Sequence, residues 1–537
     1  MNRRAFGAAL AAAAVLPAAA CTGDDGDGDG GARRDGPADP GAPLRVLAAS
    51  ELADMEPVLE AARRATGIGV DVTYSGTLDA VEAVASGRAD GTYDAVWPAS
   101  AGQLRLRPAA GGKVVSQTPV MTSPVAFGVG ARAADRLGWT DPERVTWARI
   151  QRAVAAGRLT YGMTDPLRSH SGYSALIAVA SALSDAQSAL TGADVRRATP
   201  GLAEFFTGQS LTSGSSGWLA DAYLHRGDTV DALVNYESVL LSLNRDHDAG
   251  LTVIRPRDGV VTADYPLAAL TSAGPGRRDA VRALTRYLLS EPAQRLITER
   301  TLRRPVSPAV GPAPALPASK RRELPYPGSR SVSDALLASY EHKLRRPART
   351  VYVLDTSGSM AGGRLAALKA ALTELTGTAS SPAGRRFRDR EEVTLMPFGS
   401  AVKSTRTHVV RPGRPDAALA AIRADVDALA AHGDTAIFSS LRAAYGHLAR
   451  AAGDGPYLTT IVLMTDGENT TGADAPAFRR FYTALPRDQR ATPVFPIVFG
   501  DSDRDELAGI ADLTGGRLFD ASKGPLDAAF EEIRGYQ

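Results

Sequence analysis

The run Val351-Tyr352-Val353-Leu354-Asp355-Thr356-Ser357-Gly358-Ser359 decides the fold of the C-terminal part of this chain. Its four apolar residues predict a fully buried strand. One carboxylate and two hydroxyls follow at alternate positions, around a glycine that permits a tight turn. Oxygen ligands on a turning loop suit a hard divalent cation such as Mg²⁺.

Two later segments supply what this loop lacks. Residues 461–467 form another apolar strand that ends in Asp466, and Gly433-Asp434-Thr435 places a hydroxyl just before a helical pattern. Strands at 351–354, 392–398, 457–465, 493–499 and 517–519 predict a doubly wound sheet. Ligands on such sheets bind beyond the carboxyl ends of the strands, so Asp355 and Asp466 are expected to meet there.

This D-x-S-x-S, then T, then D set resembles the metal-ion-dependent adhesion site of the von Willebrand factor type A (VWA) family, across residues 348–537. The resemblance implies a Rossmann-like VWA domain that holds Mg²⁺ or Mn²⁺. Ser357, Ser359 and Thr435 would bind the ion directly or through water, and Asp355 and Asp466 mainly through water. An acidic side chain of a protein partner would complete the shell. A serine-rich turn after a buried strand is the alternative.

One position departs from the family pattern. The family usually has glycine where this chain has Asp434. A third carboxylate there would tighten the ion yet repel the acid of a partner.

The composition is that of ordinary soluble domains, with 44% hydrophobic and 22% charged residues. At 537 residues the chain is too long for one hydrophobic core. The net charge of +2, with both signs interspersed, gives no footprint for nucleic acid. There is no P-loop, no H-E-x-x-H and no G-x-S-x-G elbow, so we expect a binding protein and not an enzyme.

The N-terminus predicts export. A short basic region precedes an apolar stretch that ends before Cys21, and residues 1–21 are interpreted as a signal peptide. Ala18-Ala19-Ala20-Cys21 resembles a bacterial lipobox, which implies lipidation of Cys21 and a place on the outer face of the cell membrane. A plain A-x-A cleavage site and a secreted protein are the alternative. Residues 22–42, rich in Gly and Asp, predict a disordered tether.

Residues 43–302 alternate strands and helices, which indicates a parallel sheet. Residues 118–132 form a long extended run broken by two prolines, which indicates a crossing between lobes, and a second α/β region follows. A closing amphipathic helix is expected over 278–300. This layout resembles a type II bacterial extracellular solute-binding protein, with two α/β lobes joined by two crossings.

Several turns of this domain place hydroxyls at predicted helix starts. The free N–H groups and the dipole of a helix start favour an anion, so two such ends across a cleft would clamp a small oxyanion. Ordinary N-capping is the alternative for each residue, Ser50 included, which precedes a helix expected over 51–66. The candidate ligand residues are Ser50, Ser75, Thr77, Ser169, Ser171 and Tyr236.

Residues 303–347 combine a proline-rich stretch, expected to be a stiff extended connector, with a helix over 331–344.

The sequence as a whole predicts a cell-envelope protein that joins a small-ligand module to a metal-dependent adhesion module. Two alternatives stay open: a substrate receptor of an ABC importer, and a scaffold whose first domain binds no ligand. A polar cleft with converging hydroxyls would favour a receptor, and a filled apolar cleft a scaffold.

Overall fold

The computed structural model describes residues 42–226, 230–377, 386–451, 457–498, 503–521 and 526–536. The predicted signal peptide, the lipidation at Cys21 and nearly all of the tether lie outside these residues. Within the described part of the chain, no helix is long and apolar enough to cross a membrane.

The first lobe is a five-stranded sheet of order β2-β1-β3-β11-β4, in which β1 pairs in parallel with β2 and β3, and β11 runs antiparallel. Its strands are β1 (Leu44–Ala49), β2 (Val70–Ser75), β3 (Ala95–Trp97), β4 (Thr118–Pro119) and β11 (Pro266–Ala269). Its helices are η1 (Ser50–Met55), α1 (Glu56–Thr66), α2 (Thr77–Ser86), α3 (Ala101–Leu106), α4 (Pro108–Gly111), α11 (Pro275–Leu288) and α12 (Glu291–Thr301).

The second lobe is a sheet of order β10-β5-β8-β6-β7, with β9 and β12 also paired to β5. Its strands are β5 (Met121–Gly130), β6 (Tyr161–Gly162), β7 (Gln209–Leu211), β8 (Ala232–Tyr236), β9 (Leu251–Ile254), β10 (Thr262–Ala263) and β12 (Arg304–Pro305). Its helices are α5 (Ala131–Leu137), η2 (Pro142–Arg144), α6 (Trp147–Ala155), α7 (His170–Ser184), α8 (Gly192–Phe206), α9 (Ser216–Arg226) and α10 (Glu237–His247).

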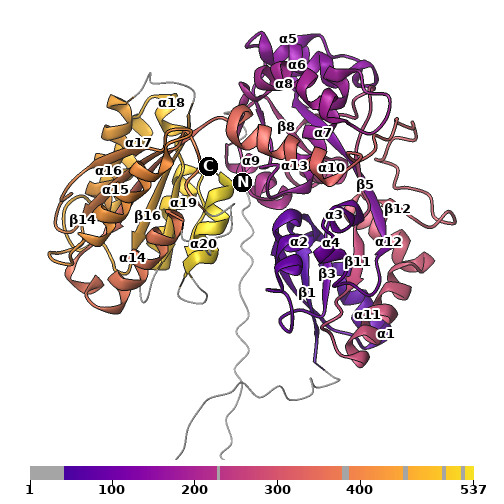
Figure 1. Cartoon of the computed structure of the whole chain (residues 1–537), viewed down its shortest axis with the longest axis horizontal. Helices are drawn as coiled ribbons and strands as arrows, with labels where there is room; N and C mark the ends of the chain where they lie inside the picture. The colour runs from indigo at the N-terminus through magenta and orange to yellow at the C-terminus, as the bar shows by residue number, and fades with distance from the viewer. Residues whose placement is uncertain are drawn as a thin grey trace, which may run out of the picture. The chain divides into compact units, whose positions relative to one another are not determined.

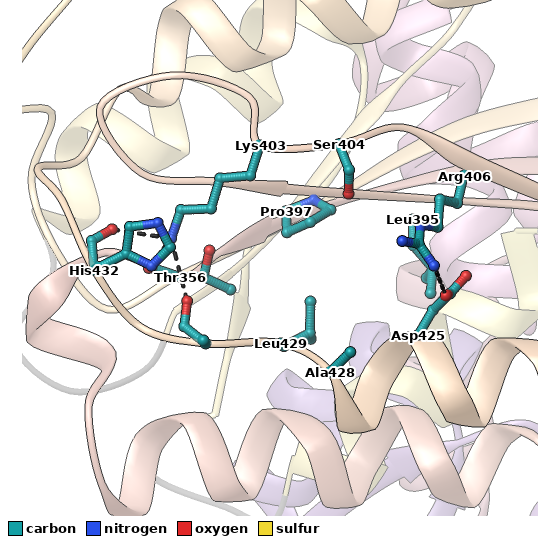
Figure 2. Close-up of a pocket in the computed structure, with 11 residues that line it drawn as sticks. Thr356, Leu395, Pro397, Lys403, Ser404, Arg406, Asp425, Ala428, Leu429 and His432 are labelled. Atoms are coloured by element: carbon teal, nitrogen blue, oxygen red, sulfur yellow. Dashed lines mark hydrogen bonds and ion pairs between the residues drawn. The ribbon is translucent and has the colours of Figure 1, made fainter.

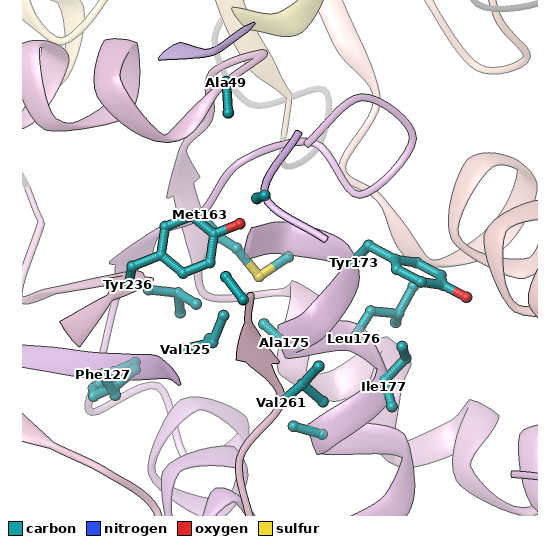
Figure 3. Close-up of a cluster of buried hydrophobic side chains, with 14 of the residues drawn as sticks. Ala49, Val125, Phe127, Met163, Tyr173, Ala175, Leu176, Ile177, Tyr236 and Val261 are labelled. Carbon is teal, nitrogen blue, oxygen red and sulfur yellow. The ribbon is translucent and has the colours of Figure 1, made fainter. Parts of the chain in front are cut away.

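The two crossings that the sequence predicts are present: β4 continues into β5, and β10 leads back into β11. A third crossing, from α12 into β12 beside β5, returns the chain to the second lobe (Figure 1). Helix α7 is apolar on nearly all sides and lies inside the second lobe. Its Tyr173 and Leu176 belong to the same buried cluster as Val125 and Phe127 of β5 (Figure 3).

Two local expectations differ from the structure. The closing helix over 278–300 is divided into α11 and α12 at Ser290, because Pro292 at the start of α12 has no N–H to continue the ladder. Ser50 does not cap a helix over 51–66. It lies inside the 3₁₀ turn η1, and its hydroxyl accepts a 3.0 Å hydrogen bond from the N–H of Gly217 in the other lobe.

The proline-rich segment lies against the first large domain instead of running free as an extended spacer. The N–H of Leu324 donates to the carbonyl of Val260, and the N–H of Val260 donates to the carbonyl of Arg322. The segment then continues into α13 (Arg330–Ser339) and the short π-type turn η4 (Tyr340–Leu344). Tyr173 of α7 and Ser333 of α13 share a 2.6 Å hydroxyl–hydroxyl hydrogen bond.

The C-terminal domain is a six-stranded sheet of order β15-β14-β13-β16-β17-β18, parallel except for β15. The strands are β13 (Ala348–Asp355), β14 (Glu392–Phe398), β15 (Arg406–Val409), β16 (Leu458–Thr465), β17 (Val494–Val498) and β18 (Phe519–Asp520). The helices are η5 (Gly358–Met360), α14 (Gly363–Leu375), α15 (Pro415–Asp427), α16 (Ile437–Arg450), α17 (Ala475–Ala484), α18 (Arg487–Arg490), α19 (Arg504–Thr514), α20 (Leu526–Ile533) and η7 (Arg534–Tyr536).

Helices cover both faces of this sheet (Figure 1). Tyr352 and Leu354 of β13 face the core that α14, α15 and α20 complete, whereas Val351 and Val353 face the core of α16, α17 and α19. The alternation explains why a strand buried on both faces is a continuous apolar run. The edge strand β15, with largely polar, exposed residues, was not expected from the sequence.

All described residues belong to one compact unit, and several contacts join the C-terminal domain to the second lobe. Arg388 and Asp165, both almost fully buried, form an ion pair of 3.0 Å. The guanidinium of Arg346 donates to the carbonyl of Gln209 at 2.9 Å. Asp165 opens the loop that leads to α7, so the C-terminal domain contacts a loop of the ligand cleft predicted from the sequence.

Candidate functional site

The predicted metal residues lie together at the carboxyl ends of β13 and β16. Ser357 and Ser359 have their hydroxyls 3.0 Å apart, and Ser359 donates to Oδ1 of Asp466 at 2.8 Å. Oδ1 of Asp355 accepts from the N–H of Ser357 at 2.8 Å. Two hydroxyls and two carboxylates therefore converge from loops far apart in the sequence.

Thr435 joins this group through the third loop. A methyl group built on Gly467 would lie 3.8 Å from the hydroxyl of Thr435 and 3.9 Å from that of Ser359, so both hydroxyls border the same small space. The N–H of Gly358 donates to the carbonyl of Gly433 and ties the first loop to the third. Asp434, the departure from the family pattern, is exposed, and its carboxylate accepts from Ser400 at 3.2 Å.

The chemistry of this donor set fits a hard cation. Burial raises the pKa of Asp355, and the neighbouring charge of Asp466 raises it further, although hydrogen bonds from Ser357 and Thr465 act in the opposite direction. A divalent cation beside these carboxylates would offset both costs. Among the described residues no three His, Cys, Asp or Glu side chains form a metal cluster, so any cation here depends on the hydroxyls.

Lys403 connects two of the loops that carry the predicted metal residues, and it was not expected from the sequence to do so. Its ammonium donates to the carbonyls of Thr356, Ala430 and His432 at 2.6, 3.2 and 2.9 Å, which joins the first loop to the segment before Thr435 (Figure 2). Burial lowers the pKa of Lys403, and Asp355 opposes this shift. The residue lines a cavity of about 210 Å³ beside the site. A lone lysine carries no sequence signal for this role.

Arg364, at the start of α14, is the second unpredicted neighbour. Its guanidinium donates to Oδ2 of Asp466 at 2.6 Å, while 42% of its side chain remains exposed. Because Oδ1 of Asp466 is taken by Ser359, both oxygens of this carboxylate are oriented by side chains.

The predicted ligand residues of the second lobe also converge. The hydroxyl of Ser171 lies 2.9 Å from that of Thr164, 3.2 Å from that of Ser169 and 2.8 Å from that of Ser216. The hydroxyl of Tyr236 bonds Nδ1 of His170 at 2.8 Å. These groups are buried, and they satisfy one another within the lobe.

The helix start of the first lobe is already satisfied by protein groups. The N–H of Leu78 donates to the carbonyl of Arg168 across the lobes at 2.9 Å, and the hydroxyl of Thr77 accepts from the N–H of Ala99. Arg168 also forms a 2.7 Å ion pair with Asp79 of α2. Ser75 ends β2, where it pairs with Ala49 of β1. The N–H of Leu78 is therefore not free to bind the oxyanion that was expected at this helix start.

Tyr326 from the proline-rich segment bridges the lobes. Its hydroxyl donates to Ser100, the N-cap of α3, at 2.7 Å and also bonds Nε2 of His170, the first residue of α7. Its ring stacks on His170 with a centroid distance of 5.9 Å. An aromatic residue of the connector thus lies between two helix starts of opposite lobes, and no sequence pattern predicts that placement.

Two family models match the chain. Residues 44–300 match the bacterial extracellular solute-binding protein model, and residues 350–468 match the von Willebrand factor type A domain model. The chain therefore joins an extracellular solute-binding domain to a VWA domain, and the first match implies export. The comparison with curated proteins gives no match.

Solved structures give weaker likenesses. The periplasmic binding protein AfuA from Actinobacillus pleuropneumoniae is 12% identical, with 56% of this chain and 97% of that chain covered and a TM-score of 0.46. The sulfate-binding protein SubI from Mycobacterium tuberculosis is 20% identical over 55% and 96%, with a TM-score of 0.41. A VWA protein from Catenulispora acidiphila is 20% identical over 36% and 42%, with a TM-score of 0.28. The assignment rests on the two family models.

Proposed function

We propose that this is a cell-envelope binding protein, lipidated at Cys21, whose VWA domain binds a protein partner through a Mg²⁺- or Mn²⁺-dependent site. The solute-binding domain binds a small ligand between its lobes. Both modules act by binding, without turnover.

The convergence of three hydroxyls and two carboxylates carries the metal part of this proposal. Ser357, Ser359 and Thr435 would hold the ion directly or through water, with Asp355 and Asp466 in support. Mg²⁺ takes about six oxygens and keeps several waters. When bound, the ion supplies an electrophilic position at which an acidic side chain replaces a water.

Two neighbours favour an acidic partner. Arg364 stands half-exposed beside Asp466 and adds positive charge at the rim of the site. The carboxylate of Asp434, expected to repel an acid, is held by Ser400 at 3.2 Å. Both contacts reduce the repulsion that the departure from the family pattern would cause.

The scaffold alternative for the first domain has its own support. The lobes are bridged by the ion pair of Arg168 and Asp79 and by Tyr326. A receptor must break such contacts to open, whereas a scaffold keeps them. The cluster of hydroxyls from Thr164, Ser169, Ser171 and Ser216 favours the receptor, because converging polar groups are typical of a ligand cleft.

Thermal unfolding of the exported chain with and without Mg²⁺ tests the metal site. We expect Mg²⁺ and Mn²⁺ to raise the melting temperature of the VWA domain, and Asp355→Ala or Asp466→Ala to abolish the rise. Asp416→Asn, an exposed acid in the first turn of α15, serves as control. A wild-type protein whose melting temperature is the same with and without Mg²⁺ or Mn²⁺ would refute the site.

Native mass spectrometry of the chain, purified without added ligand, distinguishes a receptor from a scaffold. A small bound adduct would indicate a receptor, and a bare mass would favour a scaffold.

A further inference from the structure

A second interlobe pocket lies beyond the hydrogen bond from Gly217 to Ser50, outside the hydroxyl cluster of Ser169 and Ser171. It has a volume of about 260 Å³. The first lobe contributes η1 and the end of β2, and the second lobe contributes α9 and α10. Drug-sized ligands occupy roughly 300–1,000 Å³, so this pocket suits a small molecule.

The charged groups of this pocket are mainly acidic, and two of them are neutralised. Asp54 accepts from the guanidinium of Arg303 with both oxygens at 2.7 Å. Asp246 pairs with Arg245 at 2.7 and 2.8 Å. His247 is exposed and adds a positive charge only when protonated.

Two further acids, Glu51 and Asp221, form no ion pair within 4.0 Å among the residues that the structure describes. Burial raises the pKa of Asp221, and the more distant charge of Arg517 opposes this shift. Glu51 is only 7% exposed, and its Oε1 atom has no hydrogen-bond partner of normal geometry within the described structure. Burial raises the pKa of Glu51 to about 7, although the charge of Arg303 and the nearby hydroxyl of Tyr265 lower it. A buried carboxylate oxygen without a partner is destabilising, and a ligand N–H would remove that cost.

Aromatic rings form the other part of the lining. Tyr74 and Trp218 face the pocket from opposite lobes. The guanidinium of Arg517 already lies over the ring of Trp218, 5.0 Å from its centroid, and is itself paired with Glu532. Aromatic faces attract cations, most strongly when these are desolvated.

We propose that this pocket binds a small organic cation, with its ammonium group at Glu51 and Asp221 and its apolar part against Tyr74 and Trp218. The inference rests on the proposed role of the domain in binding a small ligand, and it assigns the ligand's charge. It replaces the oxyanion expectation, because the N–H of Leu78 is occupied by the carbonyl of Arg168. In this pocket Oε1 of Glu51 and Oγ of Ser242 have no partner among the described residues, and both atoms can accept a hydrogen bond from a cation.

Calorimetric titration of the exported chain tests the assignment with four probes of similar size: n-butylammonium, putrescine, n-butanol and butyrate. We expect both cations to bind measurably and the alcohol and the anion not to bind. Glu51→Gln and Asp221→Asn should each weaken the binding of putrescine at least tenfold. Asp71→Asn, an exposed acid on β2, should leave it unchanged.

Equal binding of butanol and the cations, or unchanged affinity in Glu51→Gln, would overturn the proposal. A parallel titration with sulfate and phosphate separates this failure from that of the proposed function. Binding of an anion alone would overturn the cation pocket and preserve the receptor. Absence of binding by all probes, with a bare mass in native spectrometry, would overturn both. Circular dichroism of each variant checks that it is folded.

Discussion

The hydroxyl of Ser359 donates a 2.8 Å hydrogen bond to Oδ1 of Asp466, a residue 107 positions later in the chain. The bond joins the loops that follow β13 and β16, the two central strands of the VWA sheet. These strands pair in parallel over seven residue positions, from Ala348 with Leu458 to Leu354 with Met464. The residues predicted to bind the metal are therefore brought together by the sheet itself.

Ser359→Ala should weaken Mg²⁺ binding without unfolding the VWA domain. Residues that orient or complete a metal shell typically contribute about 10–100-fold in affinity. Titration of Mg²⁺ against the melting temperature would measure the loss. Thr483→Ala, which removes an exposed hydroxyl that donates to the carbonyl of Arg479 in α17, is a control away from the predicted metal loops. An unchanged Mg²⁺ dependence would exclude Ser359 from the shell.

Lys403→Met should lower both the stability of the VWA domain and its affinity for Mg²⁺. The substitution keeps the aliphatic stem and removes the donor to three carbonyls, each worth roughly 1–3 kcal/mol when left unpaired. Urea unfolding gives the stability, and Mg²⁺ titration gives the affinity. Lys369→Met, which loses one bond to the carbonyl of Asp427 on the surface, should have a smaller effect. Equal effects of the two variants would contradict the role of Lys403.

Asp79→Asn should weaken the closed state of the two lobes. Breaking a buried ion pair costs roughly 3–5 kcal/mol, and the partial exposure of Asp79 reduces this to about 2–3 kcal/mol. Small-angle scattering should show a larger radius of gyration for the variant. The exchanged pair Asp79→Arg with Arg168→Asp should restore part of the closure. No difference in scattering would show that other contacts close the lobes.

Tyr326→Phe should lower the free energy of unfolding by about 1–2 kcal/mol, because two interlobe hydrogen bonds are lost while the ring is kept. Hydrogen exchange should rise at the starts of α3 and α7. Tyr93→Phe, on the first lobe, provides the comparison. Exchange that is unchanged at both helix starts would mean that the hydroxyl does not join the lobes.

Glu51 should make stability depend on pH between about 4.5 and 7. Its pKa is raised from 4.5 to about 7 in the folded protein, so the folded state binds the proton more tightly than the unfolded state. This contribution is fully present below pH 4.5 and is lost as the pH rises through 7. Each pKa unit corresponds to about 1.4 kcal/mol, which gives a loss on the order of 3 kcal/mol.

Comparison with Glu51→Gln isolates the effect of this one carboxyl. Denaturant unfolding of both proteins at several pH values should show a difference in stability that changes across this window. A constant difference would mean that Glu51 titrates normally.

The convergence of the loops after β13 and β16 could be predicted from the sequence because the pattern that indicates it is local. Nine residues are enough to recognise a buried strand followed by Asp355, Ser357 and Ser359. The parallel pairing of the strands then places Asp466 beside them. Lys403 and Arg364 could not be predicted, since their role depends on where a loop and a helix start lie in space. The strand β15 was missed for a related reason: an exposed edge needs no apolar alternation.

The solute-binding domain shows the same division. Its two crossings follow from the proline-broken run around β5, but the partners of its hydroxyls do not. Serines at helix starts predict free N–H groups, and only the closed arrangement of the lobes brings the carbonyl of Arg168 to Leu78. Tyr326 lies in a stretch without periodicity, so nothing local indicated that it would enter the space between the lobes.

The position of Tyr326 has a mechanical consequence. The residue belongs to the covalent path that leads through α13 and η4 into β13, the strand that ends in the metal loop. If the lobes separate, Tyr326 must either lose its contacts with one lobe or move with the other. In each case the distance that the segment between Tyr326 and β13 must span changes. A protease cut just after residue 302 would therefore break the covalent link between the first domain and Tyr326. The interlobe contacts of Tyr326 would then depend on noncovalent interactions alone.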